Sequence, residues 1–151
     1  AYHSFMTNNF LVPNLIFDSI KFDESLLQYG HEDTLFGLEL EKKGIPILHF
    51  DNPLEHEGLE SSTIFMEKTI KALENLVVLT KNNKRIETRL LRVYNKIQPF
   101  GLPYIIRFTY PLFAKSIANN LNSSSPSLFL FDLFKLAQLA IIKKRMTDTS
   151  D

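Results

Sequence analysis

A cluster of ionisable side chains, His31, Glu32 and Asp33, lies between two glycines at a point where a helix is expected to begin. The N-terminus of a helix favours an ionised carboxylate, whereas burial in a dry pocket raises the proton affinity of the same group. A carboxylate in such a pocket can act as a general base that removes a proton from a substrate hydroxyl. The alternative is that the two acids only complement the helix dipole.

Helix geometry limits whether the Glu32 and Asp33 carboxylates can face the same site. Successive residues of an α-helix point about 100° apart, so Glu32 and Asp33 are not expected to face one small site together. We expect one of them to act on the substrate while the other orients it or holds the preceding loop. Gly37, one turn after Asp33, is expected to leave open space beside that carboxylate.

A second group of potential ligands follows at residues 49–57. It consists of His49, Asp51, Glu55, His56 and Glu57. Imidazole and carboxylate groups bind zinc, manganese or iron, so one alternative function is a small metal-dependent hydrolase that uses His49, Asp51 and His56. His49 falls within an apolar run and is expected in the core, which leaves His56 as the better metal ligand.

The 151-residue chain has the composition of a globular domain, with 44% hydrophobic and 23% charged residues. Its charge is uneven, because residues 1–60 hold three Lys/Arg and eleven Asp/Glu, whereas residues 61–151 hold fourteen Lys/Arg and six Asp/Glu. The acidic part suits metals or polar chemistry, and the basic part suits anionic partners such as phosphates or lipid headgroups. Since there is no cysteine, any metal must have oxygen and imidazole ligands.

Several classes of function find no support in the sequence. There is no glycine-rich phosphate loop and no Asp-x-Asp pair, so no motif that binds a nucleotide or a phosphate is expected in this chain. The basic residues lack the interleaved aromatic side chains of single-strand nucleic-acid binders, so no nucleic-acid partner is expected. No apolar run reaches the roughly 20 residues of a membrane-spanning helix. The chain starts at Ala1 within an apolar segment, and we expect it to be a piece of a longer protein.

The candidate residues lie among short elements that the residue patterns predict. Residues 4–13 are predicted to be a strand or extended segment, and residues 14–20 a short helix. Residues 32–43 form an amphipathic pattern typical of a helix, which Gly44 is expected to end. Residues 46–50 are predicted to be a short buried strand.

The rest of the chain is predicted to be helical. Ser61 or Ser62 can cap a long helix that ends near Lys81. Further helices are expected over residues 84–97, 104–118 and 128–145. The last of these is so apolar that it must be covered, either by the protein's own core, which we favour, or by a bilayer interface.

Taken in order, these features resemble the second half of the catalytic domain of bacterial family-2 glycosyltransferases, inverting enzymes of the GT-A fold. In that family an extended Thr-Asn-Asn-Phe-like segment, a Phe-Asp-Glu loop, a Gly-x-Glu-Asp helix start, a Gly-x-Pro/Tyr strand and a histidine follow one another. The chain has the same landmarks at residues 8–9, 22–24, 30–33, 44–47 and 56. The resemblance implies an α/β fold, the C-terminal part of a Rossmann-like GT-A domain.

The resemblance also implies roles for individual residues. Asp33 matches the catalytic base, and Glu32 matches the neighbour that orients the acceptor. Four further residues are expected near the donor sugar or the acceptor, namely Asn8, Asn9, Asp23 and His31. The implied cofactor is Mn²⁺ or Mg²⁺, and His56 is expected to approach it. In the family the metal is held mainly by the Asp-x-Asp motif of the nucleotide-binding half, which is absent from this chain. The implied partners are a nucleotide-sugar donor, a UDP-sugar, and a saccharide or lipid-linked acceptor.

These implications define two regions. Residues 1–60 are expected to form the acceptor-side half of a GT-A catalytic domain, and residues 61–151 a mostly α-helical extension. The extension is expected to pack on that domain or to rest on the inner face of the cytoplasmic membrane. The implied function is sugar transfer with inversion in bacterial polysaccharide or glycolipid synthesis, in the cytoplasm, and the isolated chain is not expected to be active. A non-enzymatic module that binds a membrane surface or a partner protein is the remaining alternative.

Overall fold

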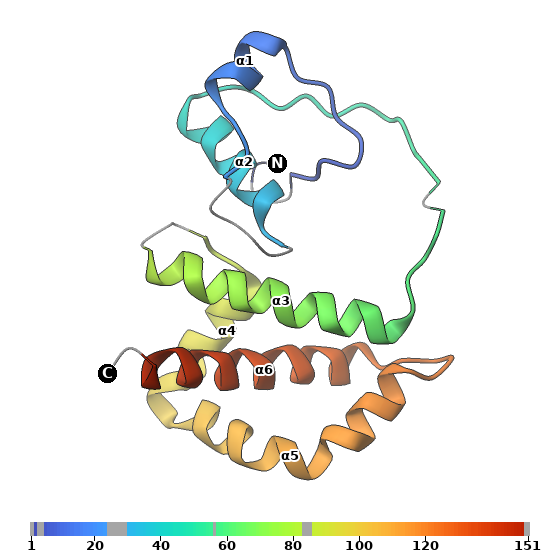
Figure 1. Cartoon of the computed structure of the whole chain (residues 1–151), viewed down its shortest axis with the longest axis vertical. Helices are drawn as coiled ribbons and strands as arrows, with labels where there is room; N and C mark the ends of the chain where they lie inside the picture. Colours follow the sequence, from blue (N-terminus) through green and yellow to red (C-terminus); the bar gives the residue numbers. More distant parts are fainter. Residues whose placement is uncertain (1, 3–4, 24–29, 56, 83–85, 150–151) are drawn as a thin grey trace.

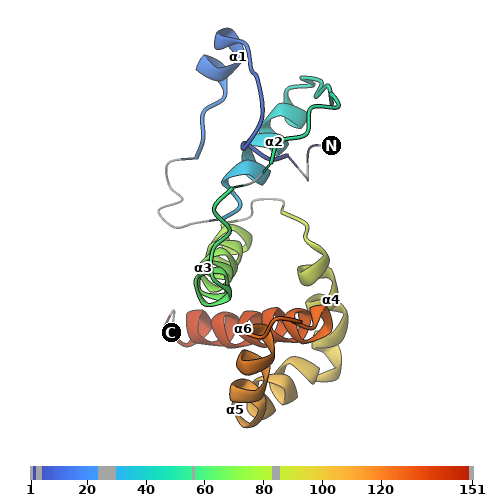
Figure 2. The same cartoon turned by 90° about the vertical axis from the view of Figure 1, so that its right-hand side faces the viewer.

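The computed structural model describes residues 2, 5–23, 30–55, 57–82 and 86–149. Within these residues the regular structure is helical (Figure 1). The elements are α1 (Asn14–Ser19), α2 (Glu32–Lys42), α3 (Ser62–Lys81), α4 (Arg89–Ile97), the 3₁₀ helix η2 (Gln98–Phe100), α5 (Leu102–Leu121) and α6 (Leu128–Asp148). Figure 2 shows α1 and α2 at one end of the molecule and α5 at the other, with α3 and α6 between them.

The predicted α/β fold, the C-terminal part of a Rossmann-like GT-A domain, is wrong. All the regular secondary structure of the described residues is helical, and these residues contain neither a strand nor a sheet. The two segments predicted as strands, residues 4–13 and 46–50, are irregular or extended chain where the structure describes them, which excludes residue 4. A strand needs a neighbouring backbone that exchanges hydrogen bonds with it, and helices offer none because their own groups bond internally. Most of the apolar run that indicated a buried strand is instead exposed: Leu48 and Phe50 are 73% and 77% accessible, and only Ile47 packs against the cluster around Phe36.

The predicted helices are confirmed, and local signals explain where they begin. The Ser61 hydroxyl caps α3 by accepting a hydrogen bond from the Ile64 N–H at 3.4 Å. The helix predicted over residues 84–97 is shorter, because the Thr88 hydroxyl caps α4 and accepts a bond from the Leu91 N–H at 3.1 Å. Helices α5 and α6 are each several residues longer than predicted.

The last helix, α6, lies at the centre of a helical bundle. It packs against α3, α4 and α5 (Figure 2). Ala137 and Leu139 on this helix are fully buried, with 0% of their surface exposed. The protein's own core therefore covers the apolar helix, as predicted, and α6 needs no bilayer to cover it.

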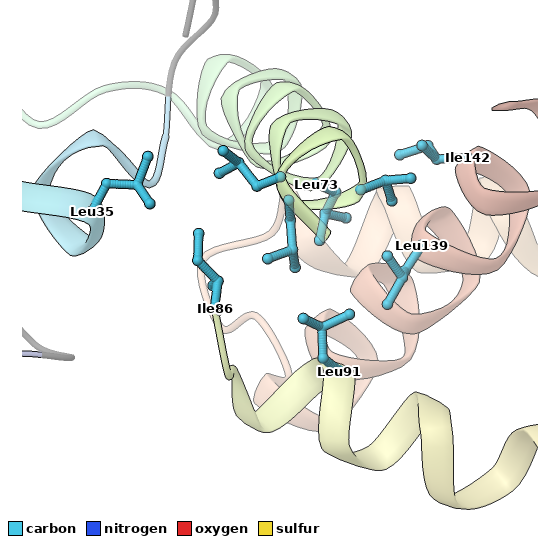
Figure 3. Close-up of a cluster of buried hydrophobic side chains, with 9 residues drawn as sticks. Leu35, Leu73, Ile86, Leu91, Leu139 and Ile142 are labelled. Carbon is cyan, nitrogen blue, oxygen red and sulfur yellow. The ribbon is translucent and has the colours of Figure 1, made fainter. Parts of the chain in front are cut away.

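A cluster of nine buried side chains joins α2 to this bundle, and Figure 3 shows how they face one another. The cluster consists of Leu35, Leu73, Leu76, Val77, Leu79, Ile86, Leu91, Leu139 and Ile142. Leu35 comes from α2, whereas the others come from α3, α4, α6 and the segment before α4. Burial of such side chains stabilises the fold by about 1.5–3 kcal/mol each. The first turns of α2 are therefore held against α3.

A second cluster holds the N-terminal segment on α2. At its centre Phe36 is 2% exposed and stacks on Phe22, with ring centroids 4.8 Å apart. Phe5 and Phe10 lie against the same ring, with centroids 5.5 Å and 6.2 Å away. Aromatic pairs of this kind contribute about 0.5–1.5 kcal/mol each beyond their buried area. These contacts bring residues 5–8 to the start of α2.

Candidate functional site

A cleft opens beside the first turn of α2, next to the aromatic cluster. Its volume is about 820 Å³, within the range of small-molecule sites. The residues that line it are Phe5, Met6, Thr7, Asn8, Phe22, Gly30, His31, Glu32, Asp33 and Thr34. Four of the predicted site residues, Asn8, His31, Glu32 and Asp33, therefore meet in one cleft.

Thr7 holds the Asp33 carboxylate in place. Its hydroxyl donates to Asp33 Oδ1 at 2.8 Å, and its backbone N–H donates to Asp33 Oδ2 at 3.3 Å. The two bonds fix the plane of the carboxylate and join the N-terminal segment to the start of α2. Sequence reasoning missed Thr7, because no local signal marks a contact between residues so far apart in the chain.

Glu32 lines the same cleft, contrary to the expectation that neighbouring helical residues cannot share a site. The cleft extends around the first turn of α2 and is large enough to reach both side chains. Glu32 Oε2 is buried and has no hydrogen-bond partner among the described residues. Leaving a buried carboxylate oxygen without a hydrogen-bond partner costs free energy.

His31 precedes the first turn of α2 with a left-handed backbone, at a φ of 73°. This conformation is uncommon for residues other than glycine, and it indicates that surrounding contacts hold the turn at residues 30–31, which we call the corner before α2. Burial lowers the pKa of the His31 imidazole, although the Glu32 carboxylate and a hydrogen bond to the Ala72 backbone act in the opposite direction. At neutral pH the imidazole is therefore uncharged and can both donate and accept a hydrogen bond.

Gly30 and Asn75 hold this corner against α3. Gly30 has a φ of 110°, and a Cβ on it would lie 2.6 Å from Ala72 Cβ, so only glycine fits. The Asn75 side chain is 6% exposed and donates to the Gly30 carbonyl at 3.2 Å. Sequence reasoning missed the supporting role of Asn75. A signal was present, because Asn75 is a polar residue between the apolar Leu73 and Leu76 on the buried face of α3.

Two predicted substrate-binding residues lie outside the cleft. Asn9 is exposed, and its side-chain Nδ2 donates to the Asn52 carbonyl at 3.1 Å. Asp23 is half-buried in the segment after α1 and does not line the cleft. Adjacent residues of an extended chain point to opposite sides, so Asn8 and Asn9 do not both face the same site.

The open space expected beside Gly37 is filled by the chain itself. A Cβ on Gly37 would lie 2.3 Å from the Tyr2 carbonyl oxygen and 2.8 Å from Phe5 Cβ. The glycine therefore allows the N-terminal segment to pack closely on α2, and it does not provide access to Asp33.

The second group of potential ligands forms no metal site within the described residues. His49 and Asp51 lie on the exposed segment between α2 and α3, and His56 lies outside the described residues. Because His49 is exposed, its predicted place in the core is wrong. In the part of the chain that the structure describes, no three His, Asp or Glu side chains are grouped to hold a metal ion.

No helix among the described residues is both long enough and apolar enough to cross a membrane. Comparison of the chain with protein-family models, with curated proteins and with solved structures finds no match. The function of the cleft therefore has to be inferred from its own chemistry.

Proposed function

We propose that this cleft binds the acceptor saccharide of an inverting glycosyl transfer and that Asp33 is the catalytic base. The observation that carries the proposal is the position of the Asp33 carboxylate, which Thr7 holds in a cleft of about 820 Å³ that Glu32 also lines. A general base needs such a site, where it can reach the proton that it removes. The ordered landmarks that resemble family-2 glycosyltransferases support the same assignment.

The lining of the cleft suits a sugar. A sugar ring presents C–H groups on its faces and hydroxyls around its edge. Phe5 and Phe22 supply aromatic surface for the faces, and Asn8 supplies both a donor and an acceptor for the hydroxyls. Glu32 also lines the cleft, and its carboxylate can accept a hydrogen bond from a hydroxyl next to the reacting one. This contact would orient the acceptor.

The reaction needs a base because a sugar hydroxyl is a weak nucleophile at neutral pH. Asp33 accepts the hydroxyl proton while the acceptor oxygen forms a bond to the anomeric carbon of the donor. The bond from that carbon to the nucleotide diphosphate breaks on the opposite face, so the diphosphate leaves with the electron pair and the configuration inverts. A positioned general base contributes about 10²–10⁴-fold to the rate of such a step.

In this proposal residues outside the cleft bind the donor, a UDP-sugar. The described lining contains no lysine or arginine that could neutralise a diphosphate. The reaction would take place in the cytoplasm, where nucleotide sugars are made, and at the inner face of the membrane when the acceptor is linked to a lipid.

Saccharide binding to the 151-residue chain tests the proposal. We expect glucose, galactose, N-acetylglucosamine or their short oligomers to shift the backbone amide signals of residues 5–8 and 30–34 in nuclear magnetic resonance titrations. A dissociation constant of about 1–10 mM is expected for a partial site of this kind. Asp33→Ala should weaken binding about tenfold, because it removes a charged hydrogen-bond acceptor.

Asp51→Ala is the matched control, since Asp51 lies on the exposed segment between α2 and α3. It should leave the saccharide affinity unchanged. The proposal fails if Asp33→Ala and Asp51→Ala behave alike, or if none of the saccharides shifts the cleft residues at concentrations well above the expected dissociation constant.

A further inference from the structure

A second cavity is lined by residues of α4, η2, the start of α5 and the last turns of α6. Figure 1 shows that these elements belong to the helical bundle, away from α1. Its volume is about 610 Å³. The lining includes Tyr94, Tyr104, Arg107, Lys143, Lys144 and Thr147. Among the described residues of this lining there is no acidic side chain. The cavity thus combines positive charge with hydroxyl donors, the groups that bind a phosphate.

Two of these cations, Arg107 and Lys143, have no ion pair with a carboxylate in the described part of the chain. Arg107 Cζ lies 5.3 Å from the centroid of the Tyr104 ring, and Lys143 Nζ lies 4.6 Å from the centroid of the Tyr94 ring. Burial lowers the pKa of Lys143, so a bound anion would stabilise its charged form. Both side chains are therefore ordered by aromatic rings and available to an anion.

Helix α5 leaves an apolar face uncovered beside this cavity, which we call the outer face. Its members are Tyr104, Ile105, Phe108 and Leu112, which are 64%, 52%, 73% and 77% exposed. They recur at the spacing of one helix face, while Ile117 on the opposite face is buried against α6. Figures 1 and 2 both show α5 as the outermost helix of its end of the molecule. Tyr104 belongs to both features, since it lines the cavity and begins the outer face.

The charge of this region favours one kind of occupant. Between Glu87 and Asp132 the sequence contains no acidic residue, and its charged residues there are Arg89, Arg92, Lys96, Arg107 and Lys115. A region that is both apolar and basic complements a surface that is both apolar and anionic. A bilayer with anionic phospholipids offers acyl chains to the outer face and phosphate groups to the cavity, so one occupant accounts for both features.

We propose that the outer face of α5 lies in the interface of an anionic phospholipid bilayer and that the cavity beside it holds the phosphate of a lipid headgroup. In this arrangement Phe108 and Leu112 enter the boundary of the acyl chains, while Arg107 and Lys143 face the phosphates. The proposal does not depend on glycosyl transfer, because none of these residues lines the cleft beside α2.

An introduced tryptophan tests the contact, because the chain contains none of its own. Phe108→Trp should shift its fluorescence to shorter wavelength with vesicles of phosphatidylcholine and phosphatidylglycerol, and much less with phosphatidylcholine alone. Leu15→Trp on α1, where the leucine is 85% exposed, is the matched control. It should show no shift with either kind of vesicle.

Removing the two unpaired cations tests the cavity. Arg107→Gln/Lys143→Gln should lower the partition coefficient onto the anionic vesicles about 25-fold in a sedimentation assay, which corresponds to about fivefold for each charge. The control Lys42→Gln/Lys71→Gln removes two exposed charges from α2 and α3. It should change the partition coefficient less than about twofold, since charges beyond a Debye length of the membrane are screened.

Three results would overturn the proposal. The first is no shift for Phe108→Trp, or an equal shift for Leu15→Trp. The second is a Phe108→Trp shift that grows with protein concentration without vesicles, together with a dimer in analytical ultracentrifugation, because the occupant would then be a second copy of the chain. The third is binding of inorganic phosphate that depends on Arg107 and Lys143 without any binding to vesicles, which would make the cavity a site for a free phosphate compound.

Discussion

Thr7 donates hydrogen bonds to both oxygens of the Asp33 carboxylate, at 2.8 Å and 3.3 Å, although the two residues are separated by 26 positions in the chain. The pair closes the N-terminal segment onto the start of α2, and both residues line the cleft. Each carboxylate oxygen has a second acceptor position, which a ligand can use. The pair therefore connects the stability of this end of the molecule with its proposed chemistry.

Thr7→Val should destabilise the protein by about 1 kcal/mol. The substitution keeps the shape of the side chain and the backbone N–H but removes the hydroxyl that donates to Asp33 Oδ1. Thr7→Ser keeps the hydroxyl, so its loss of unfolding free energy should be less than about half that of Thr7→Val. Urea unfolding followed by circular dichroism measures both values. Equal losses for the two variants would show that the hydroxyl does not hold the segment.

Gly30→Ala should be far more destabilising than Gly44→Ala. Both glycines have a positive φ, 110° and 66°, so an alanine is strained at either position. At Gly30 the new methyl group would also lie 2.6 Å from Ala72 Cβ, whereas nothing lies within 4 Å at Gly44. We expect a loss of about 1 kcal/mol for Gly44→Ala and at least about 3 kcal/mol for Gly30→Ala. Similar shifts in Tm for the two variants would contradict the packing of this corner on α3.

The helices could be predicted from the sequence because their signals are local. Ser61 caps α3, and Gly44 follows α2 with a positive φ, as the residue types indicated. Apolar residues at helical spacing also identified the buried face of α2, where Leu35, Phe36 and Leu40 are buried. None of these features depends on a distant part of the chain.

The strands could not be predicted in the same way, because a strand depends on a partner. Residues 46–50 are apolar enough for a buried strand, yet Leu48 and Phe50 are exposed and the described residues provide no strand to pair with them. The order of motifs that resembles a GT-A domain likewise says nothing about which segments meet. Composition and motif order were therefore insufficient to establish the fold.

The candidate site was predictable only where its residues are neighbours in sequence. His31, Glu32 and Asp33 reach one cleft because they share the start of one helix. Thr7 and Asn75 come to this corner from 26 and 45 positions away, through contacts that the aromatic cluster and α3 create. Thr7 carries no local pattern, and the polar Asn75 on the buried face of α3 indicates a buried partner without identifying it, so only the structure identifies these two contacts.

Under the proposed function, Asp33→Asn should remove most of the glycosyl-transfer activity. An amide keeps the size of the side chain but cannot accept the hydroxyl proton, so kcat should fall about 10²–10⁴-fold. The affinity for the nucleotide sugar should stay the same, because the donor is bound elsewhere in the proposed arrangement. Asp18→Asn is the control, since Asp18 is exposed on α1 and does not line the cleft. An Asp33→Asn variant as active as Asp18→Asn would refute the assignment of the base.

His31 should make the protein less stable as the pH falls below about 6.5, the ordinary pKa of histidine. Burial lowers the pKa of this imidazole in the folded protein, so the unfolded chain binds the proton more readily. The contribution of His31 to the free energy of unfolding is therefore intact above the ordinary pKa and declines as the pH drops through the lower, folded value. Asparagine tolerates a left-handed backbone, so His31→Asn should keep the turn and flatten this decline with pH. Urea unfolding at several pH values measures the effect, and the control His49→Asn, on the exposed segment, should not flatten the decline. A His31→Asn profile that parallels the wild type would show that another group causes the acid sensitivity.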